Sequence, residues 1–361
     1  MSVPEARGAG WTEERAQRGT SEHATREARE SASRAAVEGG RVPGAAREMR
    51  RAAPSAGEGR PPSARECGAI SAVAGQSQRE MREWAARYPG LFAAEAFDAA
   101  LYGTLAAAAA FSGPHLGAAG LRMANRVCLW CFGLDWLIDY AATSERDVRD
   151  IVRRCLAVAD GAAPTSGDDL TCALAELRDE LAAEPAFPGL RALWRDELSR
   201  MLAAMAREWA WKAARDAGVV DRPTFEEYLA NADNLGFSFV FAAHWIATTG
   251  PGEGDDEGHD LVRAASWEVQ RVIRILNDLG TYERDLTWGD LNGLMFDVDR
   301  DGVERRLAEV TELARARLGE LRDGHPRLAG LADYMERQME FCAGFYGVTD
   351  FWGSVSDEAT R

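Results

Sequence analysis

The chain has 361 residues and a formal net charge of −16, with 58 acidic residues against 42 basic ones. An acidic protein repels nucleic acid and anionic membrane surfaces, so neither is expected as a partner. The longest apolar stretches, residues 101–111 and 235–247, are shorter than the roughly 20 residues that a transmembrane helix needs. We expect no membrane insertion and, because no export signal is visible, a cytoplasmic location.

Residues 1–75 differ in composition from the rest of the chain. They consist mostly of Ala, Arg, Glu, Gly, Ser and Pro, with Trp11 as their only aromatic residue and almost no Leu, Ile or Phe. Such a segment buries too little apolar surface to offset the entropy cost of ordering it. We therefore predict a disordered N-terminal extension over residues 1–75 and one helical domain over residues 76–361.

From about residue 77 onward, apolar residues recur at intervals of three and four, and no run alternates with the period of two that strands show. Gly and Pro residues divide this body into about nine or ten helices, several of them long. The pattern predicts an all-α fold, a single large helical bundle that is too big for a simple four-helix bundle.

The predicted helix over residues 224–249 is unusual, because residues 235–247 are apolar on all faces. Such a helix is buried. It also contains Gly236, and a glycine in mid-helix costs about 1 kcal/mol relative to alanine. A central core helix and a helix broken beside a ligand cavity both explain these features.

The six cysteines are scattered along the chain, which favours reduced thiols. Cys128 and Cys131 have the C-x-x-C spacing that redox and zinc sites share. They lie in an apolar helical run without a second pair nearby, so we interpret them as helix-packing residues.

Asp135 and Asp139 lie one helical turn apart in a segment made otherwise mainly of Trp, Leu, Ile and Phe. Side chains at i and i+4 project from the same helix face. Two like charges on an apolar helix repel each other and lose hydration, which is tolerated when a cation lies beside them. Mg²⁺ bound by carboxylates and substrate phosphates is a recurrent arrangement. The pair indicates either a magnesium site or a helix end that faces water.

A second polar ladder lies near the end of a helix predicted to begin at about residue 260. Asn277, Thr281 and Asp285 are spaced i, i+4, i+8, so three oxygen ligands follow one face. Such a ladder can chelate one Mg²⁺, which prefers oxygen ligands. The planar guanidinium of the adjacent Arg284 suits a phosphate. A polar helix end in solvent is the alternative explanation.

Taken together, the aspartate pair and the later Asn-Asp-x-x-Thr-x-x-x-Asp helix, followed by Gly289-Asp290-Leu291-Asn292, resemble the bacterial class I terpene synthases. The resemblance covers roughly residues 80–352. It implies an α-helical bundle with a central active-site cavity.

The same resemblance implies roles for individual residues. Asp135 would be the principal metal ligand of the first motif and Asp139 its outer carboxylate. Asn277, Thr281 and Asp285 would chelate another ion, with three Mg²⁺ ions in all. Arg284 would take the place of the basic residue that binds diphosphate in the family.

Three departures from the family pattern affect diphosphate binding. Trp136 stands where the family has a second aspartate, and Asn231 stands where its diphosphate-sensing arginine is expected. Residues 349–352 replace the usual Arg-Tyr pair. Diphosphate recognition would then depend on Mg²⁺, Arg284 and Arg274, with Asn231 kept as a substrate-binding candidate.

The resemblance implies Mg²⁺-dependent ionisation and cyclisation of a linear isoprenyl diphosphate. Geranylgeranyl diphosphate is favoured over farnesyl diphosphate, because residues 231–236 and the surroundings of the aspartate pair look more like bacterial diterpene cyclases. A carbocation needs an apolar cavity with aromatic faces that stabilise its charge. Such a cavity favours the explanation of Gly236 as a break in a helix beside a ligand, with residues 231–241 lining the cavity. The candidate wall residues, each of which packing alone also explains, are Phe132, Trp136, Phe237, Phe241, Trp288, Phe345 and Trp352.

Other readings stay open. A chain-elongating prenyltransferase shares the architecture but should carry two Asp-Asp-x-x-Asp motifs. A ferritin-like di-iron protein would need Glu-x-x-His repeats, and no histidine here has a Glu three positions before it. A non-catalytic helical relic of a terpene synthase is the third alternative. The sequence also leaves open whether the protein is a monomer or a homodimer.

Overall fold

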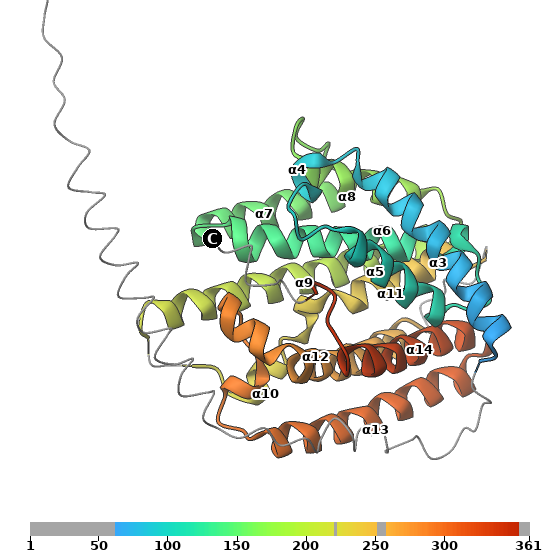
Figure 1. Cartoon of the computed structure of the whole chain (residues 1–361). Coiled ribbons are helices and arrows are strands. Elements are labelled where there is room, and N and C mark those ends of the chain that lie inside the picture. The colour runs from blue at the N-terminus through green and yellow to red at the C-terminus, as the bar shows by residue number, and fades with distance from the viewer. Residues whose placement is uncertain (1–61, 220–221, 251–257, 354–361) are drawn as a thin grey trace, which may run out of the picture. The chain divides into compact units, whose positions relative to one another are not determined.

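The computed structural model of the chain describes residues 62–219, 222–250 and 258–353. These residues are largely helical and contain no β-strand, which confirms the all-α prediction (Figure 1). The α-helices are α3 (Ala64–Ala85), α4 (Pro89–Phe92), α5 (Ala99–Ser112), α6 (Ala118–Trp136), α7 (Glu145–Ala159), α8 (Asp169–Ala182), α9 (Phe187–Asp216), α10 (Phe225–Leu229), α11 (Phe237–Thr248), α12 (His259–Trp288), α13 (Arg300–Gly324) and α14 (Ala329–Tyr346).

The helices pack as a bundle around α6, α11, α12 and α14. Helix α12 contacts α11, α13 and α14, whereas α6 contacts α3, α5, α8 and α11. Figure 1 shows α13 along one side of the bundle, next to α12 and α14. No helix among the described residues is long and apolar enough to cross a membrane.

Helix α3 corrects the predicted boundary of the N-terminal extension. It begins at Ala64, so the part of the predicted disordered segment that follows Ser63 is helical. Ser63 caps the helix through a reciprocal pair of hydrogen bonds with Glu66, and a buried stripe that includes Ile70 and Met81 anchors it to the core. Average composition concealed this stripe. Residues 1–61 lie outside the described residues.

The predicted helix over residues 224–249 is broken at Gly236, as the cavity interpretation required. Helix α10 ends at Leu229, a 3₁₀ turn covers Ala232–Leu235, and α11 begins at Phe237. Gly236 has φ +72°, a left-handed conformation that side chains disfavour. A Cβ there would also lie 2.7 Å from Sδ of Met201.

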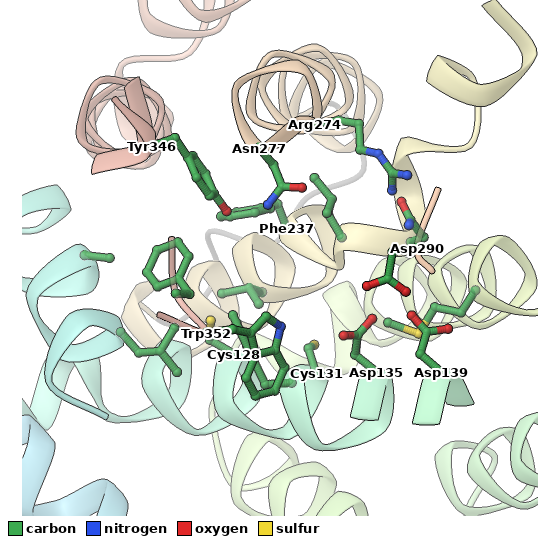
Figure 2. Close-up of a pocket in the computed structure, with 18 of the residues that line it drawn as sticks. Cys128, Cys131, Asp135, Asp139, Phe237, Arg274, Asn277, Asp290, Tyr346 and Trp352 are labelled. Carbon is green, nitrogen blue, oxygen red and sulfur yellow. The ribbon is translucent and has the colours of Figure 1, made fainter. Parts of the chain in front are cut away.

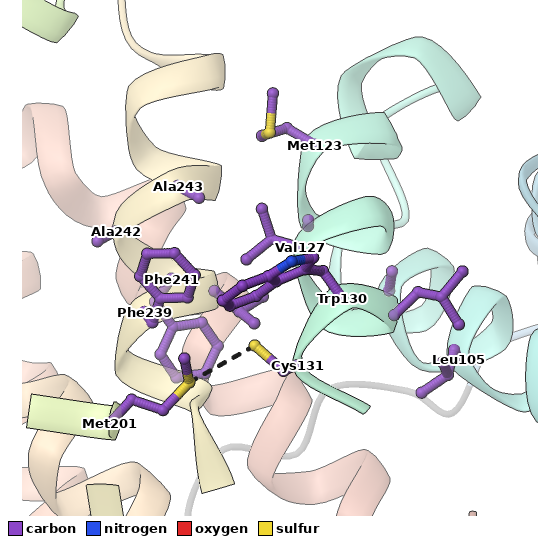
Figure 3. Packing of buried hydrophobic residues seen from close by; sticks show 14 of the residues in the cluster. Leu105, Met123, Val127, Trp130, Cys131, Met201, Phe239, Phe241, Ala242 and Ala243 are labelled. Atoms are coloured by element: carbon purple, nitrogen blue, oxygen red, sulfur yellow. Dashed lines mark hydrogen bonds between the residues drawn. The ribbon is translucent and has the colours of Figure 1, made fainter. Parts of the chain in front are cut away.

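A dense aromatic core lies next to this break (Figure 3). The Phe239 ring of α11 packs against Trp130 of α6 and Trp194 of α9, at centroid distances of 6.0 and 5.6 Å. The Cys131 thiol donates a hydrogen bond to Sδ of Met201 at 3.6 Å. Cys131 therefore packs in the core, as predicted for the C-x-x-C pair.

Helix α6 ends in a π-helical turn at Leu137–Ala141, directly after Trp136. The Ala142 amide donates to the Leu137 carbonyl at 2.8 Å, five residues back. Such turns are rare and are often found at functional sites. The turn contains Asp139, the second carboxylate of the first motif.

Candidate active site

The bundle contains a cavity with a polar and an apolar end (Figure 2). Its volume is about 1210 Å³, open space at its mouth included. The residues that carry its polar end are Asp135, Asp139, Tyr140, Glu208, Asn234, Arg274, Asn277, Arg284, Asp285 and Asp290. The apolar end is lined mainly by residues of α5, α6, α11 and α14 and of the segment after α14. The two predicted motifs, more than 130 positions apart, therefore line the same space.

The carboxylates of the first motif lie on one face, at the end of α6 and in the π turn. Burial raises the pKa of Asp135 well above its usual range, and the nearby charges of Asp139 and Asp290 raise it further. Burial also raises the pKa of Asp139, to about 6, although Lys212 opposes this effect. Burial and mutual repulsion thus disfavour the charged form of both carboxyls in the first motif.

Asp290 and Lys212 lie beside the carboxylates of the first motif. No sequence pattern predicted a role for either residue. Nζ of Lys212 lies 2.8 Å from Oδ1 of Asp139 and 3.1 Å from Oδ1 of Asp290. The Tyr140 hydroxyl donates to the other Asp290 oxygen at 2.7 Å. In Figure 2, Asp290 reaches down from the far side of the cavity toward Asp135 and Asp139.

The second motif forms a ladder on α12. The Thr281 hydroxyl donates to Oδ2 of Asp285 at 2.6 Å, and the Asn292 amide donates to the same oxygen at 2.8 Å. Asn277 makes a side-chain hydrogen bond to Tyr346. Asn277 and Asp285 line the cavity, whereas Thr281 is buried beside them and is not a lining residue.

Arg284 links the second motif to the segment that follows α14. Its guanidinium lies 2.8 Å from Oδ1 of Asp285 and 3.0 Å from Oδ1 of Asp350. It also lies 5.4 Å from the Trp288 ring centroid, within cation–π range. Burial lowers the pKa of Arg284, but the charges of Asp285 and Asp350 outweigh burial and raise it. Arg284 is therefore charged at the cavity wall.

Arg274, the other basic residue that the sequence suggested for diphosphate, is held by protein groups. It donates to both Glu208 oxygens at 3.1 Å and to the Tyr228 hydroxyl at 2.8 Å. Tyr228 in turn donates to Asp278 at 2.7 Å. Burial raises the pKa of Asp278 to about 7, although the Arg274 charge opposes this effect. The charge of Arg274 is thus balanced by Glu208 within the protein.

Asn231, predicted to bind substrate, does not line the cavity. Its amide donates to the Ala204 carbonyl at 2.9 Å and is buried. The cause is the break in the helix, because Asn231 lies between α10 and the 3₁₀ turn, whereas Asn234 of that turn does line the cavity. The side chain at the position expected for a diphosphate sensor is thus directed to the backbone of α9.

The predicted aromatic wall divides into two layers. Phe132, Phe237, Phe241 and Trp352 line the cavity. The other three predicted wall residues lie one layer behind, because intervening aromatic rings separate them from the space. They are Trp136 against Tyr140 and Trp352, Trp288 against Tyr140, and Phe345 against Phe341 and Phe351.

Known proteins with similar sequences are terpene synthases. A family model described as terpene synthase family 2, C-terminal metal binding, matches residues 126–296, which contain both motifs. The ent-pimara-9(11),15-diene synthase of Streptomyces sp. strain KO-3988 is 29% identical over 287 residues, which cover 77% of this chain and 92% of the relative. Both comparisons thus show that the chain is similar to bacterial class I terpene synthases.

Solved structures of terpene synthases share this fold. Linalool/nerolidol synthase from Streptomyces clavuligerus, in complex with 2-fluorogeranyl diphosphate, has a TM-score of 0.58 at 19% identity, over 75% of this chain and 96% of that chain. 2-Methylisoborneol synthase from Streptomyces coelicolor A3(2), in complex with Mg²⁺ and 2-fluorogeranyl diphosphate, has a TM-score of 0.60 at 16% identity, over 79% and 94%. At these identities the likeness concerns the fold alone.

The polar end of the cavity fits a hard divalent cation. Asp135 and Asp139 carry oxygen ligands that suit such a cation, and burial raises the pKa of both carboxyls in the absence of one. Across the cavity, Asn277 and Asp285 add an amide and a carboxylate oxygen. In the part of the chain that the structure describes, no three His, Cys, Asp or Glu side chains are already grouped as a metal site. Water and phosphate oxygens would have to complete the coordination.

Proposed function

We propose that this enzyme uses Mg²⁺ to ionise a linear isoprenyl diphosphate and cyclises the resulting carbocation with release of diphosphate. Geranylgeranyl diphosphate is the favoured substrate and farnesyl diphosphate the next. The observation that carries this proposal is a cavity whose polar end is lined by residues that include Asp135, Asp139, Asn277 and Asp285, while its other end is mainly apolar. Diphosphate and hydrocarbon chain require these opposite environments in one space.

The residues of the polar end bind and orient the diphosphate. Asp135 and Asp139 on one side and Asn277, Thr281 and Asp285 on the other would hold Mg²⁺, three ions in all, which supply positive charge to the leaving group. Arg284 would contact a phosphate oxygen, because its guanidinium is buried at the wall and charged. These groups are positioned before the reaction, so they stabilise developing negative charge without reorganising.

The apolar end protects the carbocation. Phe132, Phe237, Phe241 and Trp352 present aromatic rings, whose negative faces attract a cation. Few polar side chains lie in this part, so water is kept from the reactive carbon. Cys128 and Cys131 are also present there, but burial raises the pKa of the Cys128 thiol to about 12, and it stays protonated and a poor nucleophile.

The curated relative supports the substrate class. It is an ent-pimara-9(11),15-diene synthase, and a pimaradiene is a C20 hydrocarbon. This relative favours a C20 diphosphate for the present enzyme.

Product analysis tests the proposal directly. The purified enzyme is incubated with Mg²⁺ and single C10, C15 or C20 allylic diphosphates, without isopentenyl diphosphate, and the extracts are analysed by gas chromatography with mass spectrometry. We expect a cyclic C20 product and a smaller yield from the C15 substrate. A strict requirement for isopentenyl diphosphate would indicate a chain-elongating prenyltransferase instead. No diphosphate release from any substrate would indicate a non-catalytic relic.

A further inference from the structure

Lys212 is the only lysine in a chain with 42 basic residues. It lies near the end of α9, and its side chain is only 10% exposed. Every other Lys or Arg position in the chain is an arginine, so a lysine at this position is unusual. A compact ammonium group differs from a guanidinium because it bonds in several directions as a point charge. The position of Lys212 therefore suggests a specific task.

Lys212 joins two segments of the site that are far apart in the sequence. Its Nζ contacts Asp139 in the π turn after α6 and Asp290 in the loop after α12. The next turn of α9 strengthens this junction, since Arg215 donates to the Gly289 carbonyl at 2.7 Å. Lys212 does not line the cavity, whereas both of its carboxylate partners do. It thus acts on the cavity through these partners.

The charge balance explains why a cation is needed there. Asp135, Asp139 and Asp290 all line the polar end of the cavity, and Lys212 is paired with the last two of them at 2.8 and 3.1 Å. Removal of one partner from a buried ion pair leaves an uncompensated charge, which is strongly unfavourable. Trp136 meanwhile occupies the position at which the family's motif has another carboxylate. This motif therefore has one ligand fewer and one internal cation beside it.

We propose that Lys212 is a positioning residue, which ties Asp139 to Asp290 and supplies from within the chain a positive charge that a divalent cation would otherwise supply at this edge of the first motif. The inference rests on the proposed role of Asp135 and Asp139 as cation ligands. It explains how two carboxylates stay in place before substrate arrives. It also predicts that the substrate-free enzyme has little need of Mg²⁺ at Asp139.

The first test measures how Mg²⁺ changes thermal stability. In Lys212→Met, Asp139 and Asp290 lose their cation, so the full-length variant should unfold at a lower temperature than wild type in EDTA. Added MgCl₂ at constant ionic strength should restore more stability to the variant than to wild type. The apparent affinity for Mg²⁺ without substrate should be at least about tenfold tighter in the variant. Lys212→Arg keeps the charge and should respond like wild type.

A matched control removes a cation from a buried carboxylate outside the cavity. Arg263 lies 3.1 Å from Glu197, which is 4% exposed, and neither residue lines the cavity. Arg263→Met should lower the unfolding temperature without any gain in the Mg²⁺ response. If Lys212→Met behaves like this control, Lys212 has a structural role only and the inference is wrong. Should the single variant not fold, Lys212→Met with Asp290→Asn removes both charges and should regain the wild-type response.

The second test uses the lysine as a spectroscopic probe. Wild-type enzyme labelled with ¹³C at lysine Cε gives one ε-methylene signal, because there is one lysine. The signal should lie away from that of an exposed lysine, and should move in Asp290→Asn and on addition of Mg²⁺ with inorganic diphosphate. A signal at the exposed position that does not move in Asp290→Asn would overturn the inference. A wild-type enzyme that binds neither Mg²⁺ nor diphosphate would instead overturn the proposed function.

Discussion

Single side chains at the polar end of the cavity are fixed by neighbours that are far away in the sequence. Asn277 makes a side-chain hydrogen bond to Tyr346 of α14. Tyr346 can approach so closely because α12 has Gly280 there, where a Cβ would lie 2.7 Å from the Tyr346 carbonyl oxygen. An amide oriented in this way keeps its oxygen available to the cavity. The geometry of Asn277 is thus set by the contact between two helices.

Replacement of this amide tests its role in catalysis. We expect Asn277→Ala to lower kcat/KM for the preferred diphosphate by about 100-fold or more, because a positioned oxygen ligand is lost. Steady-state diphosphate release measures the effect. Asn125→Ala is the matched control, since Asn125 is buried on α6 outside the cavity. Equal activities of the two variants would remove Asn277 from the site.

Another buried side chain makes stability depend on pH. His244 stacks on Tyr334 at 4.0 Å, and burial lowers its pKa to about 4. The unfolded chain binds the proton more readily, so the stabilising contribution of neutral His244 is complete above pH ~6.5 and is lost as pH falls toward 4. Between pH 7 and 5 the loss should be roughly 2 kcal/mol.

This loss can be isolated by comparing wild type with His244→Leu, because the other titrating groups are common to both. Urea unfolding at pH 7 and pH 5 gives the free energy of unfolding of each protein. The variant should lose about 2 kcal/mol less than wild type over this range. An identical pH dependence would mean that His244 is not neutral and buried in the fold.

The sequence predicted most of the candidate ligands but not their supports. Asp135, Asp139, Asn277 and Asp285 could be read from spacing on a helix, because helical periodicity is local. Lys212 could not, since its partners lie 73 and 78 positions away and no local pattern links them. Its status as the only lysine was a signal available in the sequence.

At the scale of elements, two departures from regular α-helix shape the cavity. The π turn at Leu137–Ala141 changes the direction of the residues after α6, and the left-handed Gly236 separates the 3₁₀ turn from α11. As a result Asn234, Leu235 and Phe237, on both sides of the break, all line the cavity. A continuous helix would present only one face to it.

Gly236 should be difficult to replace. Gly236→Ala combines left-handed strain with a contact at 2.7 Å, so we expect a loss of about 2–4 kcal/mol in the free energy of unfolding. Gly218 is the matched control, because its φ is +75° but nothing lies within 4 Å of the added Cβ. Gly218→Ala should cost about 1 kcal/mol. Equal losses in urea unfolding would show that packing around Gly236 is unimportant.

The helical periodicity predicted the fold class but misplaced the first helix. The stripe of α3 that includes Ile70 and Met81 has the required spacing, yet its first half lies in a segment whose average composition is that of a disordered chain. Average composition does not show where apolar residues lie along the chain, whereas helix packing depends on their spacing. The break at Gly236 was foreseen only as one of two readings, because a glycine in a buried helix can also serve close packing.

At the scale of the whole molecule, the segment after α14 forms part of the cavity wall. Trp352 packs edge-on against Phe97 and Phe132, at 5.6 and 5.0 Å, while Asp350 is paired with Arg284. This segment thus contributes an aromatic ring to the apolar end of the cavity. It also places a carboxylate on Arg284, which lines the polar end. Through these contacts the last described residues pack against α6 and α12.

Removal of this aromatic cover should change the products rather than abolish turnover. In Trp352→Ala the wall beside Phe132 is opened to water, so acyclic or hydroxylated products should increase at the expense of cyclic hydrocarbon. Gas chromatography of the product mixture measures the ratio. Trp267→Ala, a half-buried tryptophan outside the cavity, should leave the ratio unchanged. An unaltered product ratio in Trp352→Ala would exclude a role in shielding the carbocation.

The buried position of the single ε-amine has a practical side. Acylating dyes, biotin esters and activated sensor chips react with accessible primary amines, and in this chain the other candidate is the α-amine of the polypeptide itself. Such reagents should therefore modify the enzyme at one point, so that every immobilised molecule is tethered in the same way.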